Sequence, residues 1–231
     1  MSNASSVTLT PGAAAQSGDT IVVIVMTLSS RTWTLPTGFV KYGRAVTDGQ
    51  TEIQVFIKRA LSGEPASYAF NPGTGTYGGA FLQTYTGVAD VGPISYWDED
   101  EQSGTSVTWP NISVPVTGGA ALVVATTQSA ATLSTPSGWT AGYTNARGKT
   151  FDILNPSTGT LTGPSSTASA DEAHTLLSMF LTPTLQAPTN LTEPSLSGNN
   201  WNGQSLSLDM GEWIGVSDYD YVVWKRDGVA I

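Results

Sequence analysis

The sequence of 231 residues predicts an all-β protein: two tandem, duplicated antiparallel β-sandwich units of jelly-roll-like kind, followed by a shorter, partial β-sandwich. Three observations lead to this prediction. Charged residues make up only 12% of the chain, beside 25 glycines and 13 prolines, and a chain rich in turn residues favours all-β architecture. Apolar and polar residues alternate with a period of two in several segments, as in strands. Most of the chain is also an internal repeat.

The repeat is clearest at Leu35-Pro36-Thr37-Gly38-Phe39, which returns one hundred positions later as Thr135-Pro136-Ser137-Gly138-Trp139. Further segments align at this offset or, after loop deletions, at a slightly smaller one: Ser6–Thr8 with Ser106–Thr108, Gly18 with Gly118, Val22–Val25 with Leu122–Ala125, Ile53–Val55 with Phe151–Ile153, Glu64–Ser67 with Gly163–Ser166, and Phe81-Leu82 with Leu176-Leu177. The copies are predicted to span residues 1–92 and 93–186, as two sandwiches or packed as one domain. Phe39 and Trp139 are expected in equivalent core positions.

The strands of the first copy follow from local patterns. Val7–Pro11 reads as a short strand that Pro-Gly ends. Thr20–Leu28 is almost continuously apolar and rich in β-branched residues, which indicates a central strand covered on both faces. Glu52–Lys58 alternates, with Ile53, Val55 and Ile57 on one face. Tyr68–Phe70 and Tyr77–Tyr85 complete the copy as strands.

The second copy repeats this plan after a connection, Gly87–Thr105, that carries the acidic run Asp98–Glu101. Asp171–Leu181 could form a helical face, because Leu176, Leu177 and Phe180 have suitable spacing. The aligned segment of the first copy reads as a strand, and agreement between levels decides for a strand here also.

Residues 187–231 do not match the repeat and form a third segment. Ser205–Asp209 and Tyr219–Lys225 read as strands, and Asp227-Gly228 is a hairpin signal. The chain stops three residues later, so we expect the natural protein to continue. The junction at Ala187-Pro188-Thr189 is expected to be a hinge, because polar, proline-containing linkers mark domain boundaries.

Composition excludes several classes of function. The net charge is −9, with only nine lysines and arginines, and phosphate backbones require clustered basic residues. The chain has no cysteine, which excludes disulfides and thiolate metal sites. The longest apolar run, Ile21–Met26, is too short to span a membrane. The N-terminus lacks the basic and apolar regions of a Sec signal.

No catalytic, metal or cofactor site is predicted. His174 is the only histidine, its neighbours form no motif, and we interpret it as a strand residue near an edge. Asp98–Glu101 lacks the spacing of a calcium loop and is interpreted as a solvated, charged linker. Glu52, Glu64 and Asp152 are candidate carboxylates for glycoside cleavage, but no pairing can be read, since the alignment sets Gln54 against Asp152.

The tryptophans suggest a binding surface instead. Trp33, Trp97 and Trp109 lie outside the repeated hydrophobic positions. One or more of them is therefore expected to be exposed, and they are the predicted glycan or partner contacts. The remaining candidates, Trp139, Trp213 and Trp224, are better explained as core residues.

Four segments, taken in order, resemble modules of tailed-bacteriophage virion proteins and related prophage or bacterial surface proteins. They are Gly18–Val23, Pro36–Phe39, Ser62–Tyr68 and Tyr85–Val88. The resemblance covers roughly residues 6–183 and implies antiparallel β-sandwiches. It brings no known catalytic residues.

The last segment resembles the start of a bacterial immunoglobulin-like module. The resemblance is carried by Pro194–Gly198, Gly203–Leu206, Gly211–Trp213 and Trp224–Ile231. It implies that Trp224 is the buried tryptophan of the third strand.

These resemblances imply a non-enzymatic structural virion protein, exposed on the particle as a capsid decoration or head fibre. The tandem sandwich would anchor it, and the immunoglobulin-like module would attach weakly to host surfaces. The implied partners are other capsid or tail proteins, further copies of the chain and host glycans, without nucleic acid, membrane insertion or a cofactor. Alternatives are a tail-associated virion protein, a carbohydrate-binding or adhesin module of a bacterial surface protein, and a glycan-cleaving enzyme.

Overall fold

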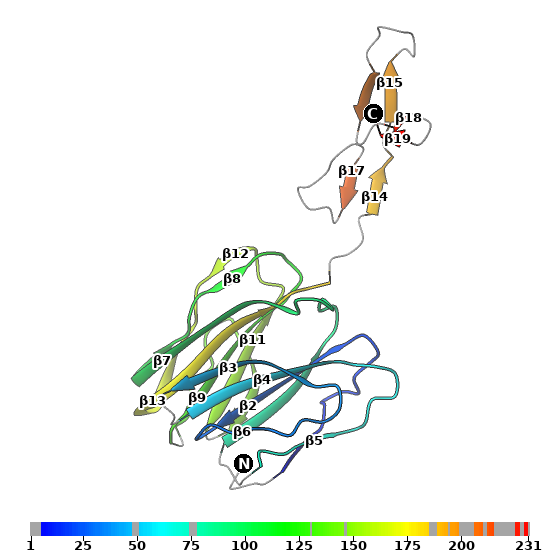
Figure 1. Cartoon of the computed structure of the whole chain (residues 1–231). Helices are drawn as coiled ribbons and strands as arrows, with labels where there is room; N and C mark the ends of the chain where they lie inside the picture. The colour runs from blue at the N-terminus through cyan, green and yellow to red at the C-terminus, as the bar shows by residue number, and fades with distance from the viewer. Residues whose placement is uncertain are drawn as a thin grey trace. The chain divides into compact units, whose positions relative to one another are not determined.

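The computed structural model describes residues 6–47, 51–73, 78–129, 131–145, 147–184, 189–193, 195–198, 206–209, 212–214, 225–226 and 229–230, and in these it is all-β (Figure 1). The chain divides into two compact units, Met1–Thr184 and Leu185–Ile231, which we describe separately. The described part of the chain contains no helix of the length and apolarity needed to cross a membrane.

The N-terminal half of the first unit forms a four-stranded antiparallel sheet with the order β3-β4-β2-β6 (Figure 1). Its strands are β2 (Thr20–Thr27), β3 (Val40–Thr47), β4 (Thr51–Arg59) and β6 (Gly78–Tyr85). The short strands β1 (Val7–Leu9) and β5 (Tyr68–Phe70) pair in a separate two-stranded sheet.

The C-terminal half forms a five-stranded sheet with the order β10-β11-β9-β13-β7. Its strands are β7 (Ile94–Thr108), β9 (Ala120–Thr127), β10 (Thr140–Asn145), β11 (Gly148–Leu154) and β13 (Ser165–Leu181). Here the separate two-stranded sheet consists of β8 (Ile112–Val114) and β12 (Gly159–Leu161).

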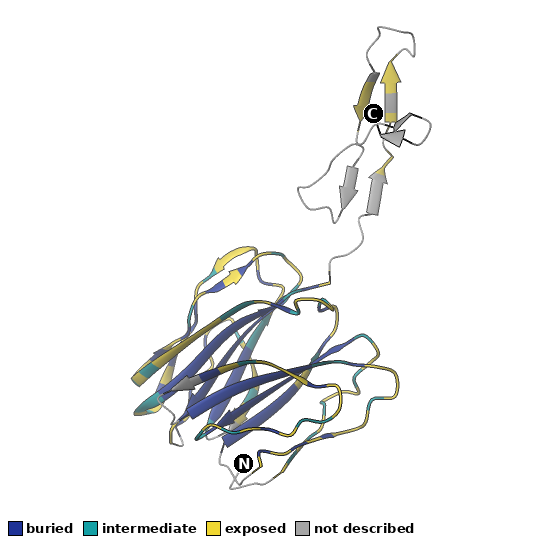
Figure 2. Ribbon diagram, viewed as in Figure 1, coloured by how far each residue is buried: buried dark blue, intermediate teal, exposed yellow. Residues whose placement is uncertain are grey.

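The two large sheets pack face to face around a shared core. Val22, Ile24 and Met26 of β2 lie in the same buried cluster as Leu122 and Val124 of β9. The alternate residues of both strands face outward, where the small sheets and the neighbouring loops cover them. Both central strands are therefore buried along their whole length (Figure 2), which confirms the prediction made from the apolar run at Thr20–Leu28.

The two halves share more than their strand order. The first turn of the repeated motif is the same in both: Phe39 N–H donates to Pro36 O, and Trp139 N–H donates to Pro136 O, each at 3.2 Å. Gly38 and Gly138 have φ of 87° and 80°, as position three of a type II turn requires. A β-bulge also interrupts both first hairpins at the same place, between Lys41 and Gly43 and between Ala141 and Tyr143.

Strand register corrects two of the predicted alignments. Ile24 pairs with Val55 and Phe81, whereas Val124 pairs with Thr150 and Leu177. Val55 therefore corresponds to Thr150 rather than to Ile153, and Phe81 to Leu177 rather than to Leu176. Both predicted alignments are displaced by an odd number of residues. In a strand, such a displacement assigns each side chain to the opposite face of the sheet.

Two further alignments were wrong in topology. Val7 pairs with Phe70 in the small sheet of its half, whereas Val107 pairs with Ser166 at the end of β7. The segment that takes the place of β1 is β8. Glu64-Pro65 precedes the small strand β5, whereas Gly163-Pro164 follows its counterpart β12.

In the two large sheets, sequence patterns missed three strands and decided one uncertain segment correctly. No strand was predicted over β3 or β10, where Lys41, Gly43 and the bulges break the period of two. The predicted connection at Gly87–Thr105 is mostly the 15-residue strand β7. Asp171–Leu181 is a strand, as predicted, and forms the second part of β13.

In its described residues, the second unit contains three antiparallel strand pairs. They are β14 (Thr189–Thr192) with β17 (Glu212–Ile214), β15 (Ser195–Gly198) with β16 (Leu206–Asp209), and β18 (Lys225–Arg226) with β19 (Val229–Ala230). Arg226 pairs with Val229, as strands on either side of the predicted hairpin would, but Asp227-Gly228 itself lies outside the described residues. The hinge at residues 187–188, the rest of the predicted strand Tyr219–Lys225 and the side chains of Trp213 and Trp224 lie outside the described residues.

Candidate functional site

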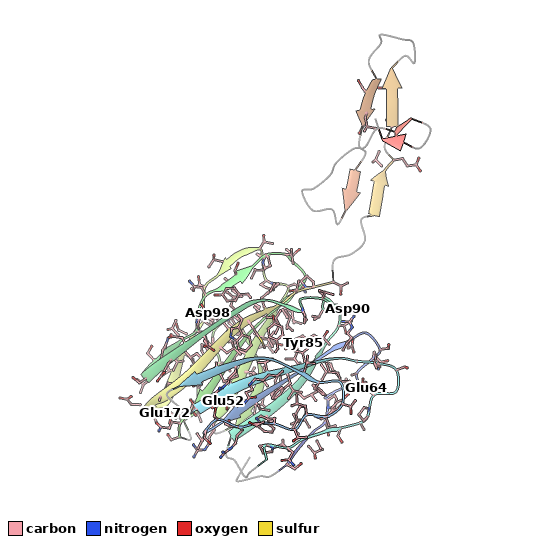
Figure 3. All side chains as sticks on the ribbon, in the orientation of Figure 1. Glu52, Glu64, Tyr85, Asp90, Asp98 and Glu172 are labelled. Carbon is pink, nitrogen blue, oxygen red and sulfur yellow. The ribbon has the colours of Figure 1, made fainter. Side chains whose placement is uncertain are left out.

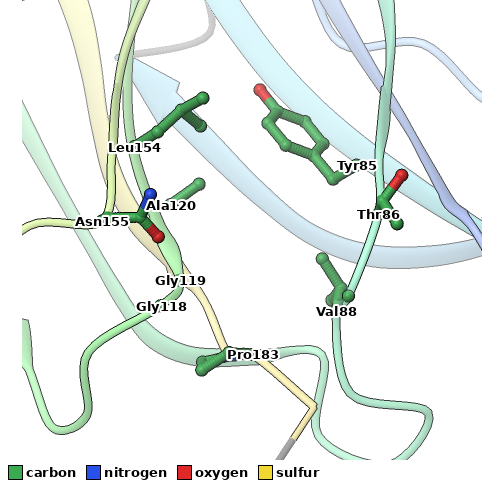
Figure 4. Close-up of a pocket in the computed structure, with 10 residues that line it drawn as sticks. Tyr85, Thr86, Val88, Gly118, Gly119, Ala120, Leu154, Asn155 and Pro183 are labelled. Carbon is green, nitrogen blue, oxygen red and sulfur yellow. The ribbon is translucent and has the colours of Figure 1, made fainter.

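A cavity of about 180 Å³ opens between the two halves of the first unit (Figure 4). It lies where β6 ends and β9 begins, and both connections turn on glycines with positive φ, Gly87 and Gly118. The lining residues are Tyr85, Thr86, Gly87, Val88, Gly118, Gly119, Ala120, Leu154, Asn155 and Pro183.

Two polar side chains point toward this cavity. Tyr85 projects toward it from one sheet, and the carboxamide of Asn155 approaches it from the other half (Figure 4). Asn155 has φ of 53°, a left-handed conformation that asparagine tolerates better than most residues. Its backbone N–H donates to Gly119 O at 2.8 Å. The loop that presents Asn155 is therefore tied to the start of β9.

Tyr85 also contacts the half-buried carboxyl group of Asp152. The tyrosine O–H donates to Asp152 Oδ2 across 3.5 Å. Burial raises the pKa of Asp152, and the hydrogen bond from Tyr85 opposes that rise. Burial and the neighbouring carboxylate together raise the pKa of Tyr85 well above its ordinary value. Tyr85 is therefore a neutral hydrogen-bond donor at physiological pH.

Asp152 reaches this position because of its register. It pairs with Leu122 just as Ile57 pairs with Val22 in the other sheet, so it points into the interface between the sheets. The predicted correspondence with Gln54 placed it on the wrong face. A correct alignment would have shown Asp152 as a carboxylate at an inward-facing position, and this was the signal for the site.

This arrangement can hold a small polar group, but the cavity is smaller than the roughly 300–1,000 Å³ of ordinary ligand pockets. It offers a phenol, a carboxamide and turn backbone beside the apolar side chains of Val88 and Leu154. Thr86, which also lines the cavity, donates its O–H to Asp19 Oδ1 at 2.8 Å.

Glu64 holds a second polar cluster on the outer side of the first sheet. Its carboxylate accepts hydrogen bonds from Lys58 Nζ at 2.7 Å, Tyr68 O–H at 2.6 Å and Leu61 N–H at 2.8 Å. Burial raises the pKa of Glu64, but these three donors outweigh it, so the pKa lies below its ordinary value. The Lys58 ammonium also lies 5.4 Å from the centre of the Tyr68 ring. These contacts fix the loop between β4 and β5.

Glu52 and Glu172 likewise anchor two equivalent loops by hydrogen bonds. Glu52 is buried, accepts Arg31 N–H at 2.9 Å and pairs with Arg44 Nε at 2.5 Å. Glu172 accepts Ser129 N–H at 2.6 Å and Ala131 N–H at 3.2 Å. The loops that follow β2 and β9 are thus each anchored by a glutamate, which comes from β4 in one half and from β13 in the other.

The three carboxylates considered for glycoside cleavage do not converge. Glu52 and Glu64 are separated on the unit in Figure 3, and each is held in its own loop-anchoring cluster. Asp152 faces Tyr85 between the sheets. None of them is brought together with another in the described residues.

His174 is a strand residue, as predicted, and it lies in the internal strand next to the edge strand β7. It lies in β13, between β9 and β7, and its side chain is fully buried. Its Nε2 lies 3.0 Å from the carbonyl oxygen of Gly104 and donates to it. The histidine therefore supports the junction of two long strands.

The acidic run belongs to an edge strand, not to a linker. Asp98–Glu101 lies in β7, where successive side chains point to opposite faces. Asp98 accepts from Tyr96 O–H, and Asp100 accepts from Gln102 Nε2 at 2.7 Å. The carboxylates are solvated, as expected, but they do not converge on one point. The described residues contain no group of three acidic, histidine or cysteine side chains that could hold a metal ion.

Two of the three predicted contact tryptophans are core residues. Trp109 is 2% exposed, and its Nε1 donates to Val124 O at 2.8 Å. Trp33 is 8% exposed and packs edge-on against Phe56. No sugar ring can stack on either, so of the three candidates only Trp97 can meet the expectation that one or more of them is exposed. Their short flanking segments gave no alternation from which burial could be read.

Trp97 remains partly exposed. Its ring packs over the backbone of Gly43, where an added Cβ would lie 2.6 Å from the indole. The ring of Tyr42 is 6.1 Å away and tilted by 40°, and its O–H donates to Ile94 O at 2.8 Å. Tyr42 is 41% exposed. Of the predicted contact residues, Trp97 is the one that a ligand can reach.

Trp139 is half-buried, against the outer core of its half, whereas Phe39 is buried in the outer core of the other.

No protein-family model, curated protein or solved structure matches this chain.

Proposed function

We propose that this protein is a non-enzymatic structural virion protein of a tailed bacteriophage, of the capsid-decoration or head-fibre type. Residues 1–186 anchor it to the particle, and residues 187–231 belong to an immunoglobulin-like module that attaches weakly to the host surface. The proposal rests on the sequence resemblances, and the structure adds support at two points.

The structural observation that most supports the proposal is the correspondence between the halves of the first unit. They share strand order, register, a turn and a bulge. We infer that they arose by duplication of one β-module, as the resemblance to tandem virion modules implies. A second, separate β-unit follows, which fits a protein assembled from modules in series.

The polar chemistry of the first unit supports a structural role. Glu52 and Glu64 each accept one backbone N–H of a neighbouring loop, and Glu172 accepts two. Hydrogen bonds to an ionised carboxylate are stronger than those between neutral groups, so they stabilise these loop conformations. Their placement fits a protein whose loops must keep one shape in an assembly.

The test is the protein content of purified particles. Particles from the host that carries the gene are separated on a density gradient, and peptides of this chain are counted by mass spectrometry against the major capsid protein. We expect a fixed ratio that survives a second gradient. Recovery of the chain only in the cell-envelope or culture-fluid fractions would overturn the proposal.

One observation favours the adhesin alternative. Trp97 and Tyr42 form a partly exposed aromatic pair at the surface, and sugar rings stack on such faces. A glycan array probed with the full chain and with Trp97→Ala separates the two. Binding that the substitution abolishes, by a protein that is absent from particles, favours the adhesin.

A further inference from the structure

The open edge of the first sheet is the place where the two halves differ. β6 and β13 occupy the same position, since each pairs with the central strand of its sheet in the same register. β13 is paired on its other side with β7. Among the described strands, β6 pairs only with β2, so it is an edge strand where its counterpart is internal (Figure 1).

Equivalent residues of β6 and β13 differ in their exposed fractions accordingly. Leu176, Leu177 and Ser178 under β7 have no exposed surface. Their counterparts Ala80, Phe81 and Leu82 retain 7%, 7% and 8%. The next residue of β6, Gln83, is exposed, whereas its counterpart Met179 is fully buried. A strip along residues 79–85 is therefore accessible where a fifth strand would lie.

The other three edges of the large sheets carry protection against pairing. β3 has a bulge together with Lys41 and Arg44. β10 has the equivalent bulge. β7 carries the four carboxylates of Asp98–Glu101. Bulges and charges are the usual means by which edge strands avoid other chains.

β6 has none of these features. Its eight residues, Gly78–Tyr85, include no charge and no proline, and its pairing with β2 runs without a register shift. An unprotected, mostly apolar edge beside three protected ones indicates that this edge is covered in the assembled protein.

We propose that β6 pairs edge to edge with β6 of a second copy of this chain, antiparallel about a two-fold axis. The sheets then join into one of eight strands, β3-β4-β2-β6 continued by the same four strands in reverse. This inference does not depend on the virion assignment.

A second copy fits this edge for two reasons. A two-fold axis perpendicular to the sheet sets the same strand antiparallel to itself and keeps like faces together, as isologous interfaces require. Ala80 and Leu82 then extend one apolar face, and Phe81 the other. The net charge of −9 opposes association, but β6 adds no charge at the contact, and salt screens charges more than about 8 Å apart.

An edge of eight residues is a small interface, so the dimer should be weak and dependent on concentration. The full chain is measured by sedimentation velocity over a hundredfold range of concentration at physiological salt. We expect the average mass to rise from one copy to two. Gln83→Lys places a charge on the exposed strip without touching the core, and should weaken dimerisation about tenfold or more.

Ser113→Lys is the matched control, because it adds the same charge on the exposed side of β8. It should dimerise like the unaltered chain. Hydrogen exchange of the amides in residues 79–85 gives a second readout that does not depend on any variant. We expect exchange to slow as concentration rises, at these residues and not at β3.

Three results would overturn the proposal. The first is a single copy at every concentration with fast exchange at residues 79–85. The second is slow, concentration-independent exchange there in a single copy, which would mean that the chain covers its own edge. The third is a dimer that Gln83→Lys leaves unchanged, which would place the contact elsewhere.

Discussion

At the scale of single residues, burial reverses what the sequence predicted for two tryptophans, since Trp109 was expected among the exposed contacts and Trp139 in the core. Trp109 is buried, donates a hydrogen bond to Val124 O and packs at a right angle on Phe151, whereas Trp139 is half-buried. Trp109→Ala should lower the free energy of unfolding by about 3–5 kcal/mol. Trp139→Ala should cost less, about 1–2 kcal/mol. Urea unfolding checks both, and equal losses would contradict the burial difference.

The Glu64 cluster predicts a pH dependence of stability. The folded state lowers the pKa of this carboxyl group, so its contribution is present above the unfolded pKa and disappears as pH falls through the folded pKa. Glu64→Gln should cost about 1 kcal/mol at pH 7, and the gap to the unaltered protein should shrink below about pH 4.

The measurement is urea unfolding of both proteins at pH 7 and pH 3. Lys41→Gln, on the exposed surface of β3, serves as a control that changes a charge without removing these contacts. A gap of the same size at both pH values would show that the charge of Glu64 is not what matters.

Residue patterns predicted which residues face inward within a strand, but not which residues correspond between the halves. Ile53, Val55 and Ile57 do share the inner face, as their alternation predicted. The matches of Ile53 to Phe151 and of Phe81 to Leu176 were each off by an odd number of positions. Loop lengths that differ between the halves shift the offset, and similarity of residue type alone does not fix an even shift.

At the scale of elements, the bulge in β3 makes a specific place for Trp97. Gly43 leaves room for the indole, and a Cβ there would lie 2.6–2.9 Å from three ring atoms. Gly43→Ala should therefore displace Trp97 and lower the free energy of unfolding by about 1–3 kcal/mol. Gly12→Ala is the control, since no atom lies within 4 Å of its added Cβ. Tryptophan fluorescence and urea unfolding report the two effects.

The acidic residues of β7 are expected to keep its edge from pairing. Glu99→Gln together with Asp100→Asn should raise self-association, seen as increased light scattering and lower solubility, because two repelling charges leave an exposed edge. Glu193→Gln together with Asp209→Asn removes the same charge from exposed residues of the second unit. Equal scattering by both variants would show that net charge, and not the edge, controls association.

The strands that the sequence missed share a physical cause. β3 is an edge strand with Lys41, Gly43 and Arg44 and a bulge, so its outer positions need not be apolar. β7 is long and mostly exposed, with charged residues in its middle. Edge strands gain less from burial than central strands, and the period of two is correspondingly weak in them.

At the scale of the whole molecule, the contact between the sheets is what the sequence could not supply. The halves pack through equivalent faces: β3 of the first half lies against β13, and Phe81 of β6 lies 6.1 Å from the Tyr143 ring of β10. Because β10 is the counterpart of β3 and β13 is the counterpart of β6, these two contacts are equivalent, as in an isologous dimer. Alternation within one strand shows that a face is buried, but not which other face covers it.

The division into two units gives the last prediction, which concerns a chain that ends after Gln186. The three buried clusters of the described residues all lie between Val7 and Leu181, so this shortened chain should unfold in one transition, with a free energy within about 1 kcal/mol of that transition in the full chain. Urea unfolding of both chains tests this, and a loss of several kcal/mol would mean that the second unit stabilises the first. Under the proposed function, the shortened chain should still join the particle but lose attachment to the host. If instead it fails to join while residues 187–231 bind particles unaided, the anchor and the projecting module must be exchanged.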